Sequence, residues 1–255
     1  MGITAAMATD RPWDLRLVGG WQLHRGGQPV KVALRQQRLL AALALYGRQS
    51  RTFLAGLLWP DSSEHQAAGS LRESVFLVNR TLPQLLSSTQ DPLDLDEHVS
   101  VDVRDLRAQA GRLEEHANPG LQQSLLEAVQ DAELLPGWYE DWVISEQERW
   151  QRLRLSVLER LAKQFLLLGR IDPAMEAARA ATTIEPLRES AQRLLLQCYL
   201  AEGNNAEALR AYQSFRIRLR QEFGVAPSPI ISDLISSLVE GSDGEQQLGR
   251  SGGRG

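Results

Sequence analysis

The feature that most constrains the fold of this chain is a repeat with a period of 34 residues in its C-terminal half. Gly169 and Gly203 hold equivalent positions, and the pattern around them stays in phase in the pairs Leu161 and Leu195, Phe165 and Tyr199, Ala174 and Ala208, Ala177 and Ala211. A period of this length is typical of stacked helix pairs, since each pair buries its apolar face only against a neighbour. The second half is therefore predicted to be an all-α helical repeat.

An aromatic run, Leu134 to Val143, precedes the repeat. Its Trp138, Tyr139 and Trp142 can each bury a large area, so we interpret the run as a core anchor. A ligand-stacking box is the alternative. Pro136-Gly137 is predicted to end a helix over 121–135, because proline and glycine are typical just past a helix end. Ser145, with Glu148 three residues on, predicts a capping box for a helix over 146–168.

The N-terminal half changes from alternating to helical patterns. Alternation predicts short strands over 13–18, 21–24 and 29–32. Helical periodicity follows over 34–46, then over a short helix capped by Ser50, then over 63–82 with Asp61 or Ser62 as its cap. Residues 92–94 and 99–103 are predicted to pair as a hairpin. Sheet, helix-turn-helix and hairpin together make a winged helix, whose third helix enters the major groove of DNA.

The third of these helices has one apolar stripe, formed by Ala68, Leu71, Val75, Val78 and Leu82. The 3, 4, 3, 4 spacing predicts that this stripe faces the core. The outward side is then expected to carry Gly69, Glu73, Phe76, Leu77 and Arg80, with Arg72 and Asn79 on its flank.

Several motifs then point to a family. Ala68-Gly69-Ser70-Leu71-Arg72 resembles the recognition helix of SARP-type bacterial activators, and Leu57 to Asp61 resembles the end of their second helix. Four further motifs, over 135–143, 148–149, 185–189 and 222–228, look like the bacterial transcriptional activator domain of the same regulators. The resemblance implies a mainly α protein: an OmpR-like α+β winged helix-turn-helix followed by an all-α, tetratricopeptide-like domain. It also implies a DNA-binding transcriptional regulator that acts as an activator.

The resemblance implies double-stranded promoter DNA as the partner. The polar residues expected to contact it are Ser70, Arg72, Ser74, Asn79, Arg80, Arg35 and Arg38. The helical domain is expected to mediate homodimerisation or contact with RNA polymerase. Departures from the family pattern at Glu73, Phe76 and Leu77 leave an alternative open. A carboxylate repels phosphate, although it can accept from a cytosine amine, and two large apolar residues are typical of a protein contact. The alternative is a protein-interaction scaffold that no longer reads DNA.

Charge is unevenly distributed along the chain. The whole chain has a formal net charge of −4, whereas residues 1–90 hold ten Arg or Lys against five acids, a net +5 that leaves −9 for the rest. A basic N-terminal module joined to an acidic one is compatible with a phosphate-facing surface.

The sequence favours neither an enzyme nor a metal site. The single Cys198 is expected to be a buried hydrophobe, and the histidines are scattered without ligand spacing at positions 24, 65, 98 and 116. No P-loop and no nucleophile–base set is recognisable, so no catalytic residue, cofactor or metal is expected. Since no apolar stretch suits a signal peptide or a membrane span, we expect a cytoplasmic protein.

The expected domain organisation has four parts. A flexible N-terminus covers 1–12, the winged-helix DNA-binding domain 13–103, the activator domain 104–240, and a disordered Gly/Ser-rich tail 241–255.

Overall fold

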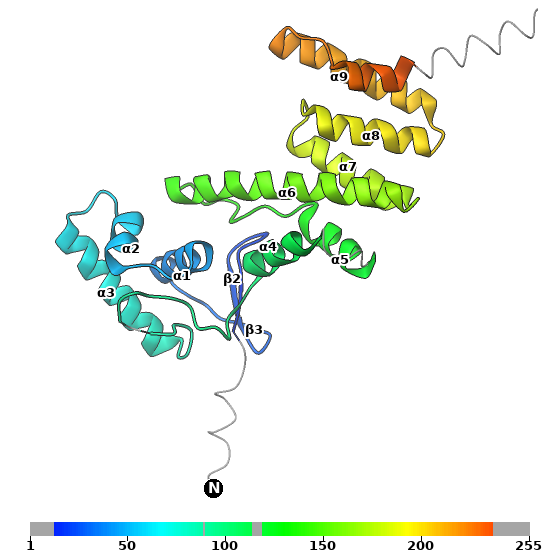
Figure 1. The fold of residues 1–255 in the computed structure, drawn as a ribbon. Helices are drawn as coiled ribbons and strands as arrows, with labels where there is room; N and C mark the ends of the chain where they lie inside the picture. Colours follow the sequence, from blue (N-terminus) through cyan, green and yellow to red (C-terminus); the bar gives the residue numbers. More distant parts are fainter. Residues whose placement is uncertain (1–12, 89, 114–118, 237–255) are drawn as a thin grey trace, which may run out of the picture. The chain divides into compact units, whose positions relative to one another are not determined.

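The computed structural model describes residues 13–88, 90–113 and 119–236 (Figure 1). Within them the chain packs as two compact units. Of the described residues, the first unit contains the N-terminal elements together with 132–150, and the second contains 119–131 and 151–236. The predicted flexible N-terminus over 1–12 and the disordered tail over 241–255 lie outside the described residues, as does His116. The mainly α fold class, with a small N-terminal mixed sheet, is confirmed.

A small four-stranded sheet organises the first unit. Its strands are β1 (Trp13–Arg16), β2 (Gln22–Arg25), β3 (Gln28–Pro29) and β4 (Ser100–Val101), in the order β3-β2-β1-β4. β1 and β2 are antiparallel, with Leu15 opposite Leu23. Leu15 also lies opposite Val101 of β4, which runs parallel to β1. All three side chains are buried, so the alternation of the sequence does place one sheet face in the core.

The predicted hairpin between 92–94 and 99–103 is wrong. Residues 100–101 pair with β1 instead, and the helix α4 (Asp102–Arg112) follows at once. Antiparallel contacts form further upstream, between Leu86 and Leu95, while Leu93 bridges to Gln49. The local pattern identified extended backbone at 100–101 but extended it wrongly over 102–103, which belong to α4. It also gave the wrong partner, because a strand's partner depends on the rest of the fold.

Three helices form the predicted helix-turn-helix core: α1 (Leu34–Tyr46), α2 (Arg51–Leu58) and α3 (Glu64–Thr81). Gly47 ends α1 at a φ of 71°, a backbone conformation that favours glycine. Ser50 caps α2 as predicted, its hydroxyl accepting a hydrogen bond from the Phe53 amide. All three helices contribute to a buried apolar centre. Its side chains include Leu39, Leu43, Leu54 and Leu71.

The aromatic run anchors the first unit, with one exception. Trp142 is buried, lies 6.4 Å from Trp138 in an edge-to-face arrangement, and lies 6.3 Å from the ring of Tyr46. The exception is Tyr139, which is 82% exposed. The run also does not end a helix as predicted, since α5 (Pro119–Val129) stops earlier. Leu134 instead forms an antiparallel bridge with Val18, and the Leu135 amide donates to the Leu17 carbonyl.

The second unit contains α5, most of α6 (Asp141–Leu167), α7 (Ile171–Ile184), α8 (Glu189–Ala201) and α9 (Asn205–Phe223). The first turns of α6 belong to the first unit. The helix begins before Ser145, so that residue is not its cap: the Ser145 hydroxyl donates to the Asp141 carbonyl inside the helix.

The 34-residue repeat appears as two turns with the same hydrogen bonds. The Arg170 amide donates to the Phe165 carbonyl at 2.9 Å, and 34 residues later the Asn204 amide donates to the Tyr199 carbonyl at 2.8 Å. Gly169 and Gly203 have φ values of 68° and 79°. The period therefore reflects two equivalent turns between paired helices, as the sequence indicates.

The last repeat closes on the segment that follows α9. Its core consists of Leu196, Ala208, Phe215, Leu219, Ile231 and Ile235. The amide of Ser228 donates to the Glu189 carboxylate at 2.9 Å. Two motifs that looked like family marks, 185–189 and 222–228, thus meet through this bond and have a structural role.

Candidate nucleic-acid interface

The start of α3 is fixed by its own sequence. Ser63 is the cap: its hydroxyl accepts from the Gln66 amide, and the Gln66 side chain accepts from the Ser63 amide. This reciprocal capping box satisfies two amides that the helix itself cannot pair. The expected caps, Asp61 and Ser62, are therefore wrong by one or two positions.

One side of α3 is buried much as predicted. Leu71, Val75 and Val78 are all in the core, as is Leu82 just past the helix. The exception is Ala68, which is exposed, whereas its neighbour Ala67 is buried. The inward stripe is thus displaced by one residue in the first turn of the helix.

The opposite side of α3 exposes four large side chains, Arg72, Glu73, Phe76 and Arg80, which we call the reading face. Arg72, Phe76 and Arg80 are spaced by four residues, and Glu73 precedes Phe76 by three, so all four lie along one side of the helix. Arg72 also bonds within its own helix, Nε donating to the Ala68 carbonyl at 3.3 Å. Phe76 is 59% exposed, a large fraction for an apolar side chain.

Three other expected contact residues on α3 lie differently. Ser74 is buried, and its hydroxyl donates to the Ser70 carbonyl at 2.9 Å, so its expected place at the interface is wrong. Ser70 and Asn79 are half-buried at the edge of the reading face. A serine at a core position can return its hydroxyl to the preceding turn, so polarity did not reveal this burial.

The two arginines of α1 have different environments. Arg35 is exposed, and its Nη1 lies 3.6 Å from Glu73 Oε2 on the reading face. Arg38 is turned inward: Nη2 donates to the Leu58 carbonyl at 2.9 Å, and Nε lies 3.1 Å from Glu140 Oε1. The structure therefore brings Arg35 to α3, whereas Arg38 links α1 to the end of α2 and to the aromatic run.

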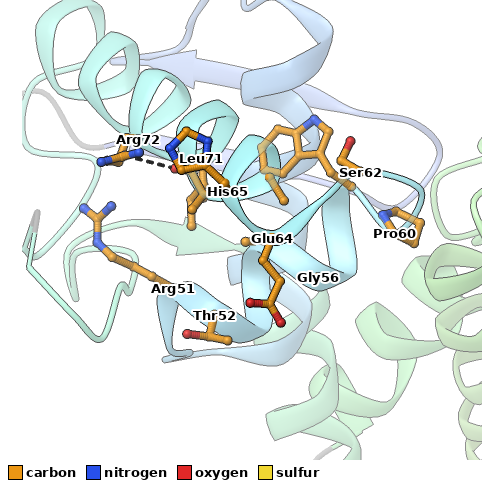
Figure 2. A pocket seen from close by; sticks show the side chains of 13 residues that line it. Arg51, Thr52, Gly56, Pro60, Ser62, Glu64, His65, Leu71 and Arg72 are labelled. Carbon is orange, nitrogen blue, oxygen red and sulfur yellow. Dashed lines mark hydrogen bonds between the residues drawn. The ribbon is translucent and has the colours of Figure 1, made fainter.

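A hollow of 730 Å³ lies between α2 and α3 (Figure 2). Three of its lining residues can be cationic: Arg51 from the first turn of α2, and His65 and Arg72 from α3. His65 and Arg72 are seven residues apart, so they lie on one face of the helix. Figure 2 shows the Arg51 guanidinium on the same side of the hollow as His65 and Arg72, with Glu64 apart from them.

Arg51 and His65 were missed as site residues by the sequence reasoning. The signal that could have found them is the position of Arg51 directly after the Ser50 cap, and the heptad spacing of His65 from Arg72. Both place a basic group beside the reading face.

Among the described residues, no group of three or more His, Cys, Asp or Glu side chains is placed to hold a metal ion. In the same part of the chain, no helix combines the length and the apolar character that a membrane span requires.

Comparison with known proteins places the chain in a family. The model of the bacterial transcriptional activator domain matches residues 97–238, more than half of the chain. The chain belongs to this family. The resemblance to SARP-type regulators is thereby confirmed, and the family role is transcriptional regulation.

Two curated relatives share the same region. Regulatory protein AfsR of Streptomyces griseus is 29% identical over 243 residues, and that of Streptomyces coelicolor is 28% identical over 240 residues. These alignments cover 89% and 88% of this chain but 24% of each relative. The chain therefore spans about a quarter of the length of the relatives it matches.

A solved structure shares the fold. Mycobacterium tuberculosis EmbR, in complex with a low affinity phosphopeptide, matches with a TM-score of 0.69 and 18% identity. The match covers 91% of this chain and 66% of EmbR. At this identity the likeness shows the fold alone.

Proposed function

We propose that this chain is a DNA-binding transcriptional activator whose helix α3 enters the major groove of promoter DNA. The observation that carries the proposal is the reading face: Arg72 and Arg80 stand exposed on α3, the helix that a winged helix presents to DNA. Membership of a transcriptional activator family supports the same role. Arginine is suited to it, because a guanidinium can bond both a guanine edge and a phosphate.

The hollow between α2 and α3 supplies the contacts to the DNA backbone. Arg51 and His65 flank it, next to the N-terminal part of the reading face. Cationic side chains that approach phosphates release counterions, which favours binding at low salt. Arg35 of α1 lies beside Glu73 and offsets the negative charge that this carboxylate brings to the reading face.

The second unit, here called the helical unit, acts in dimerisation or in contact with RNA polymerase. Several large apolar side chains of this unit are exposed on and after α9, among them Ile217, Phe223 and Ile230. Exposed apolar groups of this kind are typical of protein contacts when they gather on one surface. Two copies side by side would occupy tandem half-sites. Light scattering with and without operator DNA gives the number of chains in the complex.

A second candidate function is a protein-interaction scaffold. It is favoured by Phe76, which is 59% exposed at the centre of the reading face, and by Glu73 beside it. In this case α3 binds an apolar surface of a partner protein, and salt has little effect on the affinity.

A gel shift of the purified chain on its own upstream DNA separates the two. We expect a shift that resists random competitor DNA and weakens steeply between low and near-physiological salt. The Arg72→Ala, Arg80→Ala double variant should lose this shift, and Arg216→Ala, an exposed arginine of α9, is the matched control. Absence of a shift by the wild type at both salt concentrations would contradict DNA binding and favour the scaffold.

A further inference from the structure

The residues that set the reading face apart from a purely basic surface are Glu73 and Phe76. Both are exposed, on the side of α3 that carries Arg72 and Arg80, while Ser74 is buried and Leu77 and Asn79 are half-buried. A phosphate-binding surface gains nothing from a carboxylate or a phenyl ring. Their chemistry must therefore be matched by something other than the DNA backbone.

We propose that Glu73 and Phe76 determine operator specificity: the Glu73 carboxylate accepts a hydrogen bond from the N4 amine of a cytosine, and the Phe76 ring contacts the C5-methyl group of a thymine in a neighbouring base pair. This inference rests on the proposed DNA-binding function. It names the base edges that the same helix recognises.

The choice of cytosine follows from the hydrogen-bonding capacity of a carboxylate. An ionised carboxylate only accepts, so the acceptor edges of guanine and the O4 of thymine repel it. Adenine offers an amine at N6, but its N7 acceptor lies beside that amine and disfavours a carboxylate there. Cytosine presents the N4 amine with no acceptor beside it on its own ring, unlike adenine, so Glu73 discriminates in its favour.

Arg35 is a positioning residue for this contact. Its Nη1 lies 3.6 Å from Glu73 Oε2, and both side chains are more than half exposed. The guanidinium restricts the carboxylate to one side of α3 and offsets part of its repulsion from the phosphates. Because the pair is solvent-exposed, its effect is on orientation and on charge at the DNA surface rather than on the stability of the fold.

Phe76 is placed for the adjoining base pair. It follows Glu73 by three residues, which corresponds to about 4.5 Å along the helix axis, while successive base pairs are spaced by about 3.4 Å. The thymine methyl is the apolar group that base edges present in the major groove. A phenyl ring exposed on this face finds its apolar partner there.

The test begins with selection of preferred duplexes from a random library by the wild-type chain. We expect a cytosine at a fixed position with a thymine in an adjacent base pair. Replacing that cytosine should weaken binding about tenfold or more, as for other direct base contacts. The Glu73→Gln variant should change the preference at this position from cytosine to adenine, because a glutamine amide pairs with the N6 and N7 groups.

The thymine contact is tested by deleting only its methyl group. Deoxyuridine at that position should weaken wild-type binding about fourfold, the equivalent of one buried methyl group. Phe76→Ala should bind both duplexes equally. Leu167→Ala, which removes an exposed apolar side chain of α6 in the second unit, is the control and should keep the wild-type ratio. Arg35→Ala should reduce the discrimination for cytosine while leaving the deoxyuridine ratio unchanged.

The outcomes separate the inference from the function on which it rests. If the wild type selects no DNA at low salt, the proposed function and this inference both fail. If it selects DNA sites without a fixed cytosine, or if Phe76→Ala retains the full deoxyuridine penalty, DNA binding stands and the assignment of Glu73 and Phe76 is overturned.

Discussion

Cys198 is the clearest case in which a single side chain's environment determines its chemistry. It is fully buried in α8, and burial raises the pKa of its thiol to about 12. Since the thiolate is the reactive species, we expect no reaction with a thiol reagent at pH 8 while the chain is folded. Full labelling should follow on addition of denaturant. Rapid labelling of the native chain would contradict the packing around α8.

Asp102 connects the sheet to α4. Its carboxylate accepts from the amides of Leu17 and Val18 at 2.9–3.0 Å and from the Val103 amide at 2.7 Å. Replacing it by asparagine puts an NH2 group where one oxygen accepts, so Asp102→Asn should be less stable at neutral pH, by about 1–3 kcal/mol. Asp105→Asn, an exposed aspartate of the same helix, should change the free energy of unfolding little.

The pH dependence of this difference has a definite sign. Burial, the largest influence, raises the pKa of Asp102 above its ordinary value despite the amides that bond it. The folded chain therefore binds this proton more tightly than the unfolded chain, whose Asp pKa is about 3.9. The resulting stabilisation is complete at pH values below the pKa that Asp102 has in the unfolded chain. It is lost as the pH rises through the higher pKa that Asp102 has in the folded chain. The wild type should gain stability relative to Asp102→Asn as pH falls from 7 to 4, measured by urea unfolding at each pH. A gap that narrows on acidification would refute the raised pKa.

The exposure of a single side chain was predictable from the sequence where the apolar pattern of its own helix determines which way it faces. Arg72 and Arg80 are exposed as expected, because the apolar stripe of α3 fixes which side faces out. Arg38 was not predictable in this way. Its partner Glu140 follows about a hundred residues later, and a contact of that separation leaves no local pattern.

At the scale of elements, the capping box tests how α3 is positioned. Ser63→Ala removes the hydroxyl that accepts from the Gln66 amide, so it should cost about 1 kcal/mol of stability. Ser62→Ala is a direct control, since the neighbouring serine does not cap the helix. Equal effects of the two substitutions on urea unfolding would show that the helix begins elsewhere.

Elements were predicted best where their signals are local. The helices α1, α2 and α3 follow from periodicity, and α2 also from its Ser50 cap. The repeat follows from its glycine turns. The prediction of the hairpin was wrong because Val101 pairs in parallel with Leu15. This pairing depends on long-range packing that the local sequence does not reveal. The prediction of Ser145 as a helix cap was wrong because α6 begins at Asp141. A serine inside a helix can bond a carbonyl of the preceding turn, as Ser145 does, so its presence does not by itself mark a helix start.

At the scale of the whole molecule, the fold divides the basic residues of the N-terminal half between its interior and its surface. The basic residues of the N-terminal half do not all face one surface, since Arg38 and Arg104 bond backbone carbonyls inside the first unit. Arg72 and Arg80 remain exposed on α3, and Arg51 lies half-buried beside the hollow that Arg72 also lines. Net charge alone predicted a phosphate-facing module, but only the structure separates the arginines that bond backbone carbonyls from those that are exposed on α3.

The salt dependence of DNA affinity measures this separation. The logarithm of the binding constant falls with the logarithm of salt concentration by about 0.9 for each phosphate neutralised. Arg51→Ala should therefore reduce the slope by about one, and weaken all duplexes alike, because a backbone contact carries no base preference. Arg216→Ala, in the helical unit, should leave the slope at the wild-type value. If Arg51→Ala changes base preference while the slope stays constant, then the hollow between α2 and α3 faces the bases rather than the backbone, and the orientation of α3 in the groove must be revised.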